Sequence, residues 1–174
     1  MPDELLRLHE EGEVVFFCGA GISMGAGLPD FKGLVRRAWK EVGYNPSSEE
    51  KRLNRDGRCD VALELLGNKL NGAITMRNGV AAVLSRYRGK NRYNRVHKAL
   101  LALSQTRDEV PRLHLVTTNF DRLFENVRQD LDCGSNSYIA PLIPVPKKFN
   151  WDGIVYLHGL LTDCPDEASL KILL

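Results

Sequence analysis

The segment Phe16–Phe31, FFCGAGISMGAGLPDF, passes from a dense apolar run into a group of small residues and ends in Leu-Pro-Asp-Phe. Its first part, together with the two preceding valines, gives the short apolar run Val14–Cys18, which is typical of a strand buried on both faces. Strands of this kind usually belong to parallel sheets. Gly19 and Gly21 follow at once, and glycine lets main-chain N–H groups approach a ligand such as a phosphate at the start of a helix. The segment therefore predicts a strand, a close-approach turn and a short helix.

Two other apolar runs predict strands of the same sheet. Leu113–Thr117 passes into the polar cluster Thr118–Asp121, and Ile154–Leu157 is followed at once by His158. In open parallel α/β sheets, the ligand crevice lies outside the carboxyl ends of the strands. We therefore expect the small and polar clusters that follow the three predicted strands to converge at one edge of the sheet.

The rest of the chain is expected to be mainly helical. The apolar residues of 34–42 keep helical spacing until Gly43, and so do several segments between Arg58 and Leu103. Tyr44–Glu50 is predicted to be a loop because it holds a proline and two serines. The three prolines of Tyr138–Phe149 restrict that segment to an extended or edge-like conformation.

Composition and charge exclude several classes of protein. The chain has 174 residues, enough for one domain with a core, and a net charge of +2, too small to indicate nucleic acid or membrane as a partner. The acidic N-terminus lacks the apolar region of a signal peptide, so we expect a cytoplasmic location and no membrane contact. The basic stretch Arg86–Lys98, which includes Tyr87 and Tyr93, is interpreted as a solvated helix face, and direct nucleic-acid binding is not expected.

The cysteines and three of the four histidines are expected to be structural. The four cysteines lie far apart without a CxxC pair, so we expect no bound metal and reduced, mostly buried thiols, at Cys18, Cys59, Cys133 and Cys164. His9, His97 and His114 each lie in a predicted helix or strand without a partner motif.

The glycines match neither common phosphate-binding fingerprint. A GxGxxG motif would need glycine at Met24 and an acidic residue at the end of a second strand, and a P-loop would need Gly-Lys-Ser/Thr. An ordinary dehydrogenase is therefore disfavoured. Taken singly, Gly19 and Gly21 could be turn glycines, and Asn119 and Asp121 could be a helix cap and an Asx turn. His158 alone could be a hydrogen-bonded structural histidine.

Taken together, four motifs give a more specific indication. GAGIS at Gly19–Ser23, GLPDF at Gly27–Phe31, TTNFD at Thr117–Asp121 and LHG at Leu157–Gly159 resemble, in order and spacing, the sirtuin (Sir2) superfamily. The resemblance covers essentially the whole chain. It implies an α/β domain with a Rossmann-like parallel sheet, helices on both faces and a helical insertion expected at 44–104. Because the chain has no CxxC pair, we expect no zinc ribbon. It also implies that the domain binds NAD and breaks the bond between nicotinamide and ribose.

The resemblance assigns roles to particular residues. The residues implied to contact the pyrophosphate and the nicotinamide ribose are Gly19, Ala20, Gly21, Ser23 and Thr118. Those implied to lie beside the nicotinamide are Asp30 and Phe31. Asn119 and Asp121 would hold the reacting ribose and water, and His158 would be the general base.

Departures from the sirtuin pattern refine this expectation. Lys32 stands where sirtuin deacylases generally carry Arg, Thr118 stands where they carry Gln, and the two CxxC pairs of their zinc module are missing. The pattern is more similar to the bacterial SIR2-like domains of anti-phage defence systems, which hydrolyse NAD. The chain also stops at Leu174, before the loops that bind the adenosine half in sirtuins, so we expect a SIR2-like domain over 1–174 that is truncated at its C-terminal end.

The expected function is therefore an NAD glycohydrolase that acts in anti-phage defence. A protein-lysine deacylase and a module that senses NAD or ADP-ribose without turnover are the alternatives. Expected partners are NAD, a further copy of the chain and a protein of the same defence system.

Overall fold

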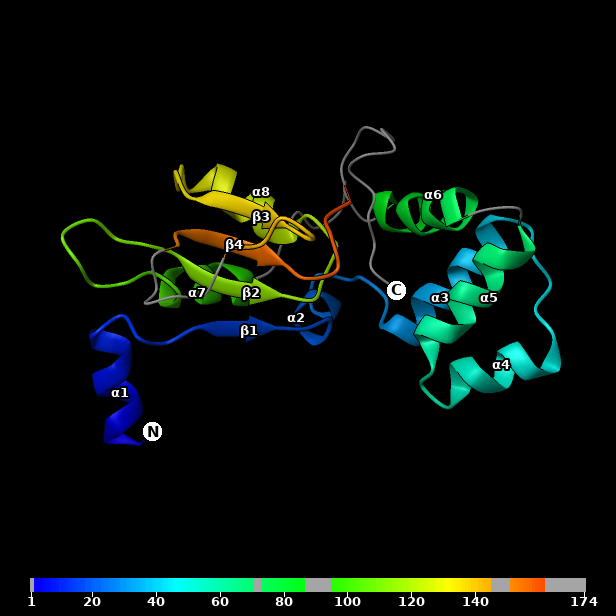
Figure 1. The fold of residues 1–174 in the computed structure, drawn as a ribbon, viewed down its shortest axis with the longest axis horizontal. Helices are drawn as coiled ribbons and strands as arrows, with labels where there is room; N and C mark the ends of the chain where they lie inside the picture. The colour runs from blue at the N-terminus through cyan, green and yellow to red at the C-terminus, as the bar shows by residue number, and fades with distance from the viewer. Residues whose placement is uncertain (1, 71–72, 87–94, 145–150, 162–174) are drawn as a thin grey trace. The chain divides into compact units, whose positions relative to one another are not determined.

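The computed structural model describes residues 2–70, 73–86, 95–144 and 151–161 (Figure 1). They belong to two compact units, a sheet unit within Met1–Ile22 and Tyr93–Leu173 and a helical unit within Ser23–Arg92. The elements of the sheet unit are α1 (Asp3–Glu10), β1 (Phe16–Cys18), α7 (Arg95–Leu103), β2 (His114–Thr117), α8 (Leu123–Asp130), β3 (Asn136–Ile139) and β4 (Gly153–Tyr156). Those of the helical unit are α3 (Phe31–Glu41), α4 (Ser48–Arg55), α5 (Cys59–Lys69) and α6 (Ala73–Ser85). The short helix α2 (Gly21–Met24) carries the chain from the first unit into the second.

The sheet unit is an α/β structure built on a parallel sheet. Its described strands have the order β1-β2-β4-β3, and every neighbouring pair is parallel. The three predicted strands form within one or two residues of their expected limits. This architecture confirms the predicted α/β class and is compatible with a Rossmann-like fold.

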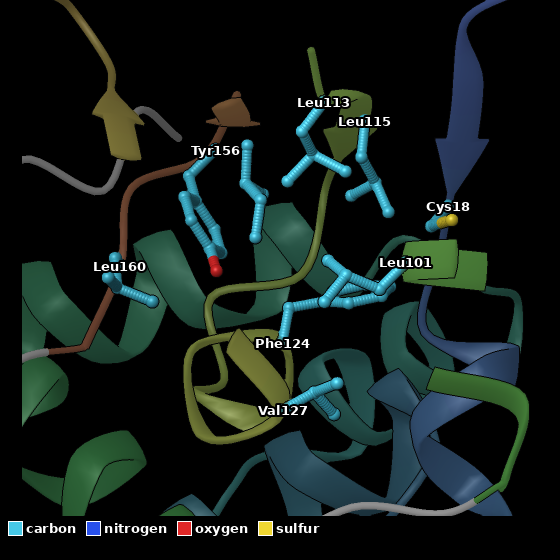
Figure 2. Packing of buried hydrophobic residues seen from close by; sticks show 9 residues of the cluster. Cys18, Leu101, Leu113, Leu115, Phe124, Val127, Tyr156 and Leu160 are labelled. Carbon is cyan, nitrogen blue, oxygen red and sulfur yellow. The ribbon is translucent and has the colours of Figure 1, made fainter. Parts of the chain in front are cut away.

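The core of the sheet unit lies between the strands and helices α7 and α8. Figure 2 shows Cys18, Leu115 and Tyr156 directed from three strands toward Leu101 of α7 and Phe124 of α8. Leu101, Leu115 and Tyr156 are each fully buried. Because side chains of a strand alternate between its two faces, these contacts identify the face of the sheet that α7 and α8 cover.

The prediction that β1 is buried on both faces is wrong. Phe17 points to the face opposite Cys18 and is 66% exposed, and Val15 just before the strand is also exposed. The reason is that β1 is an edge strand among the described residues, where an apolar run does not imply burial on both sides. The second helical layer expected from the sequence is likewise not seen over Phe17 in the part of this unit that the structure describes.

β3 is a strand that the sequence indicated only in part. The prolines predicted an extended, edge-like segment from Tyr138, and the structure shows an edge strand that begins at Asn136 and pairs in parallel with β4. Its residues are half-buried or exposed. A strand with this polar composition lacks the apolar run that identified the other three.

The helical unit is built on the apolar face of α3, which packs against α5 and α6. Leu34, Val35, Ala38 and Trp39 are buried, as their helical spacing predicted, and Gly43 ends the segment with a φ of 66°. The predicted loop Tyr44–Glu50 is only partly correct. Helix α4 begins inside it, with a reciprocal capping box between Ser47 and Glu50.

The observed helical unit has different limits from the expected insertion at 44–104. It begins at Ser23, because α3 packs with α5 and α6, and it does not include α7. Helix α7 belongs to the sheet unit because Leu101 packs in the core beneath the strands. No helix within the described ranges is long and apolar enough to cross a membrane.

Candidate functional site

The carboxyl ends of β1, β2 and β4 lie next to one another. The register pairs Cys18 with Thr117 and Thr117 with Tyr156, and these are the last residues of three parallel strands. The glycine segment, the Thr-Asn segment and the Leu-His-Gly segment that follow therefore leave the sheet at the same edge. This is the edge where open α/β sheets bind ligands.

Thr117 joins the first two of these segments. Its buried hydroxyl donates to the carbonyl of Cys18 at 3.1 Å and accepts from the backbone N–H of Asn119 at 3.0 Å. The N–H of Thr118 donates to the same Cys18 carbonyl at 3.1 Å. The sequence interpretation gave a role to Thr118 and none to Thr117. A threonine that ends a strand before further polar residues was the available signal, because its hydroxyl can bond to nearby backbone groups.

Asn119 connects the two segments through its side chain. It is 6% exposed, and its amide Nδ2 donates to the carbonyl of Gly19 at 3.3 Å. This contact joins residues 100 positions apart in the sequence. A buried amide that bonds across two loops at the sheet edge holds both loops in one arrangement.

Asp121 has a local structural contact. Its Oδ1 accepts the N–H of Leu123 at 3.0 Å at the start of α8. This is the Asx-type turn that its position between strand and helix allowed. The residue as a whole is half-buried.

His158 lies exposed on the turn that follows β4. Backbone hydrogen bonds fix the segment on both sides of it, from Leu157 N to Thr117 O at 2.9 Å and from Leu161 N to Phe120 O at 2.9 Å. The segment that carries His158 is thus bonded to the last residue of β2 and to the loop that carries Asn119.

The glycine segment is open on its outer side. Gly19, Ala20 and Gly21 are exposed, and neither glycine has the positive φ that would demand glycine. A Cβ placed on Gly21 would meet no described atom within 4 Å, and one on Gly19 would meet only the Thr118 hydroxyl, at 3.8 Å. Packing of the described residues therefore does not explain why glycine occupies these two positions.

Three of the predicted binding residues belong to the helical unit. Ser23 is buried, Asp30 caps α3 by accepting the N–H of Gly33 at 2.7 Å, and Phe31 is 37% exposed at the first turn of that helix. The capping contact gives Asp30 a structural role. The structure describes these residues within their own unit, and their part in a binding site remains a prediction.

Lys32, which departs from the sirtuin pattern, is fixed within the same unit. Its ammonium donates to the carbonyl of Arg55 at the end of α4 at 2.7 Å, and its own carbonyl accepts from Asn54 Nδ2 at 3.2 Å. A lysine at a helix C-terminus satisfies carbonyl groups that lack partners within the helix. Lys32 therefore holds the start of α3 to the end of α4.

The described cysteines have the properties expected of structural thiols. Cys18, Cys59 and Cys133 are free, and the first two are buried. Burial raises the pKa of the Cys18 thiol to about 11, so at neutral pH it stays protonated and is a poor nucleophile. Cys164 lies outside the described residues.

Three histidines have structural contacts, as predicted. His9 contacts the carbonyl of Leu103 through Nε2 at 2.7 Å, and His114 contacts that of Trp151 at 3.0 Å. His97 is fully buried with its ring 5.0 Å from that of Phe124, and burial lowers its pKa to about 4. His97 is therefore neutral at physiological pH.

In the described ranges, no group of three or more His, Cys, Asp or Glu side chains could hold a metal ion. Most of the basic and tyrosine stretch predicted as a solvated helix face falls in 87–94, outside the described residues.

Comparison with known proteins finds similarity to a protein described as uncharacterized. No family model matches the sequence. The chain is 34% identical over 175 residues to "Uncharacterized protein y4cA" of Sinorhizobium fredii (strain NBRC 101917 / NGR234). The alignment takes in 98% of this chain and 14% of that relative, so the chain spans about one seventh of the relative's length.

Proposed function

We propose that the chain forms an NAD-binding domain that hydrolyses the bond between nicotinamide and ribose, giving nicotinamide and ADP-ribose. The observation that carries this proposal is the bonding of the loops around Asn119. Its amide bonds to the Gly19 carbonyl, and its loop is tied to the loop of His158. A buried amide and an exposed imidazole thus follow the carboxyl ends of parallel strands, where open α/β sheets commonly bind ligands. The resemblance of the four motifs to the sirtuin superfamily supports NAD as the ligand.

The open glycine segment supports a ligand at this edge. Nothing in the described packing requires glycine at Gly19 or Gly21. A dinucleotide whose pyrophosphate approaches the backbone closely would supply the missing reason, since any side chain there would keep the phosphates away. In this proposal Gly19, Ala20, Gly21 and Thr118 contact the pyrophosphate and nicotinamide ribose.

The chemistry suits the residue types present. Nicotinamide leaves the cationic pyridinium of NAD as a neutral molecule, and the ribose passes through a transition state that resembles an oxocarbenium ion, as in glycoside hydrolysis. A water oxygen then forms a bond to the anomeric carbon and releases one proton. His158 is proposed to accept that proton as general base, because a neutral imidazole nitrogen can take a proton from the attacking water.

Asn119 and Asp121 are proposed to position the reactants. An amide both donates and accepts hydrogen bonds, so Asn119 can orient a ribose hydroxyl and the attacking water together. The carboxylate of Asp121 is proposed to accept a hydrogen bond from the same ribose or water. The resemblance alone assigns Ser23 to the pyrophosphate and nicotinamide ribose, and Asp30 and Phe31 to the nicotinamide.

The biological role belongs to the same proposal. The similarity to SIR2-like domains of anti-phage systems supports a cytoplasmic enzyme that depletes NAD during infection, with another copy of itself or a protein of the defence system as partner. Bacteria that carry the full-length protein should resist phage better than bacteria that carry the His158→Ala variant. Equal resistance of the two strains would mean that the catalytic activity is not needed for resistance to phage.

The decisive experiment incubates the full-length protein with NAD and follows free nicotinamide and ADP-ribose by mass spectrometry. Both products should form at equal rates, with and without an acetylated lysine peptide. Binding of NAD without product would favour the sensing module. O-acetyl-ADP-ribose formed only with the peptide would favour the deacylase.

A further inference from the structure

Glu125, in the first turn of α8, is a buried carboxylate whose two oxygens are both occupied. Its Oε1 accepts the hydroxyl of Tyr156 at 2.9 Å and that of Ser137 at 2.7 Å, while its Oε2 accepts Arg128 Nη2 at 2.6 Å. The Glu125 side chain is 6% exposed. The three donors come from β4, β3 and α8, so one carboxylate joins three elements of the sheet unit.

Such an arrangement needs a reason beyond packing. A buried charge costs several kcal/mol unless it is paired and hydrogen-bonded, and an apolar replacement of such a group is often no less stable. Arg128 is fixed in turn, because its second guanidinium nitrogen donates to the carbonyl of Ser135. The network is fully satisfied, and its effect is to fix the geometry among α8, β3 and β4.

The network lies next to the candidate catalytic loops. Tyr156 is the last residue of β4, two positions before His158, and α8 begins directly after the loop of Asn119 and Asp121. Burial, followed by the negative charge of Glu125 and its hydrogen bond, raises the pKa of Tyr156 well above its ordinary value, and the charge of Asp121 raises it further. Tyr156 therefore stays a neutral hydroxyl that can only donate to this carboxylate.

We propose that Glu125, through its bond to Tyr156, is a positioning residue that fixes the loop of His158 relative to the loop of Asn119. This inference rests on the proposed hydrolysis of NAD. Glu125 anchors the helix that follows one loop, and Tyr156 ends the strand that precedes the other. The backbone bonds that Leu157 N makes to the end of β2 and Leu161 N makes to the loop of Asn119 are expected to depend on this anchor.

The sharpest test is Tyr156→Phe in the full-length protein, which removes one hydroxyl and leaves the pair of Glu125 with Arg128 intact. We expect kcat for nicotinamide release to fall about 10-fold or more, because small displacements of catalytic groups are costly, while KM for NAD changes less than about twofold. Hydrogen–deuterium exchange should become faster in peptides that cover 118–122 and 157–161. An unchanged kcat in an active enzyme would overturn the proposal.

Two matched variants separate positioning from general weakening. Ser137→Ala removes the other hydroxyl that donates to Glu125 Oε1. It breaks only the contact between Glu125 and the edge strand β3. Tyr44→Phe removes a tyrosine hydroxyl from the buried carboxylate of Glu50 in the helical unit. Both should keep kcat within about twofold, since small losses of stability do not alter the turnover of molecules that remain folded. Equal losses of kcat in all three variants would reduce Glu125 to a purely structural residue.

The exchange measurement also separates the two proposals. If the wild-type protein released no nicotinamide, the proposed function would fail, yet the exchange of the two loops could still be compared among the variants. If Tyr156→Phe were the only variant with faster exchange in these loops, the role of Glu125 in fixing them would still be supported. Unchanged exchange in Tyr156→Phe would contradict this role of Glu125, whether or not the protein hydrolyses NAD.

Discussion

Glu50 in the helical unit and Glu125 in the sheet unit are both buried, and each carboxylate accepts from a serine, a tyrosine hydroxyl and a basic side chain. The serine donates its backbone N–H to Glu50 and its hydroxyl to Glu125. The partners of Glu50 are near in sequence or exposed. Ser47 and Tyr44 lie three and six positions before it, and Lys69 is half-exposed. The partners of Glu125 include side chains 12 and 31 positions away on two strands. The helical unit thus uses a buried charge to close a local turn, whereas the sheet unit uses one to join distant elements beside the candidate site.

The largest expected loss of stability comes from a close contact between two strands of the sheet unit. Gly153 begins β4 with a φ of 153°, and a Cβ there would lie 2.1 Å from the backbone oxygen of Asn136 in β3. Gly153→Ala should therefore lower the free energy of unfolding by about 3 kcal/mol or more, because backbone atoms of a paired strand must move apart. Urea denaturation followed by circular dichroism measures the loss.

Gly43→Ala in the helical unit is the matched control. Gly43 also has a positive φ, 66°, but a Cβ there would meet no described atom within 4 Å. The cost should be limited to backbone strain of about 1 kcal/mol. Equal losses in the two variants would mean that strain, rather than the contact between β3 and β4, determines the effect of Gly153→Ala.

The next effect concerns turnover rather than stability. Asn119→Ala and His158→Ala should each lower the rate of nicotinamide release by about 10² or more, the usual contribution of a positioned acid-base group. NAD binding measured by calorimetry should largely survive. Glu50→Gln is the control outside the sheet unit and should keep the turnover number of the folded protein. Full activity in both alanine variants would contradict the catalytic roles proposed for Asn119 and His158.

A smaller effect follows from the protonation of Glu50. Burial opposes its ionisation, but hydrogen bonds from Ser47 and Tyr44 and the ammonium of Lys69 outweigh burial and lower its pKa to about 2. A carboxylate with a lowered pKa in the folded state stabilises the protein above its unfolded pKa of about 4.3. This stabilisation is lost as the pH falls through that value toward about 2.

Glu50→Gln should therefore cost about 1–3 kcal/mol at pH 7 and progressively less below pH 4. Urea titrations of both proteins at pH 7, 4 and 3 give the difference directly. A difference that stays constant with pH would assign the loss to the hydrogen bonds of Glu50 and not to its charge.

The comparison of the two glutamates also explains how much the sequence could predict. The Ser47-x-x-Glu50 pattern is a local signature, and its capping box could have revealed helix α4 inside the predicted loop. The apolar runs and the spacing of Leu34, Val35 and Ala38 predicted strands and helices correctly for the same reason, because those patterns are local. Nothing local to Glu125 indicates that Ser137 and Tyr156 lie against it.

The same distinction holds at the candidate site. The predicted parallel sheet was enough to expect the loops of Asn119 and His158 at one edge, because the carboxyl ends of parallel strands lie together. The bonds that hold the loops, from the Thr117 hydroxyl and the Asn119 amide, depend on the register between β1 and β2. The exposure of Phe17 was missed because the sequence does not say which apolar strand lies at an edge.

The smallest expected change in stability belongs to Gly21, at the first turn of α2. Its backbone is not in the left-handed region and a Cβ would meet no described atom, so Gly21→Ala should alter the free energy of unfolding by less than about 0.5 kcal/mol. If a pyrophosphate approaches this backbone, Gly21→Val should nevertheless abolish NAD binding in calorimetry while circular dichroism stays unchanged, because its branched side chain takes the space of the phosphates. A valine variant that binds NAD as well as the wild type would make this glycine an ordinary turn residue.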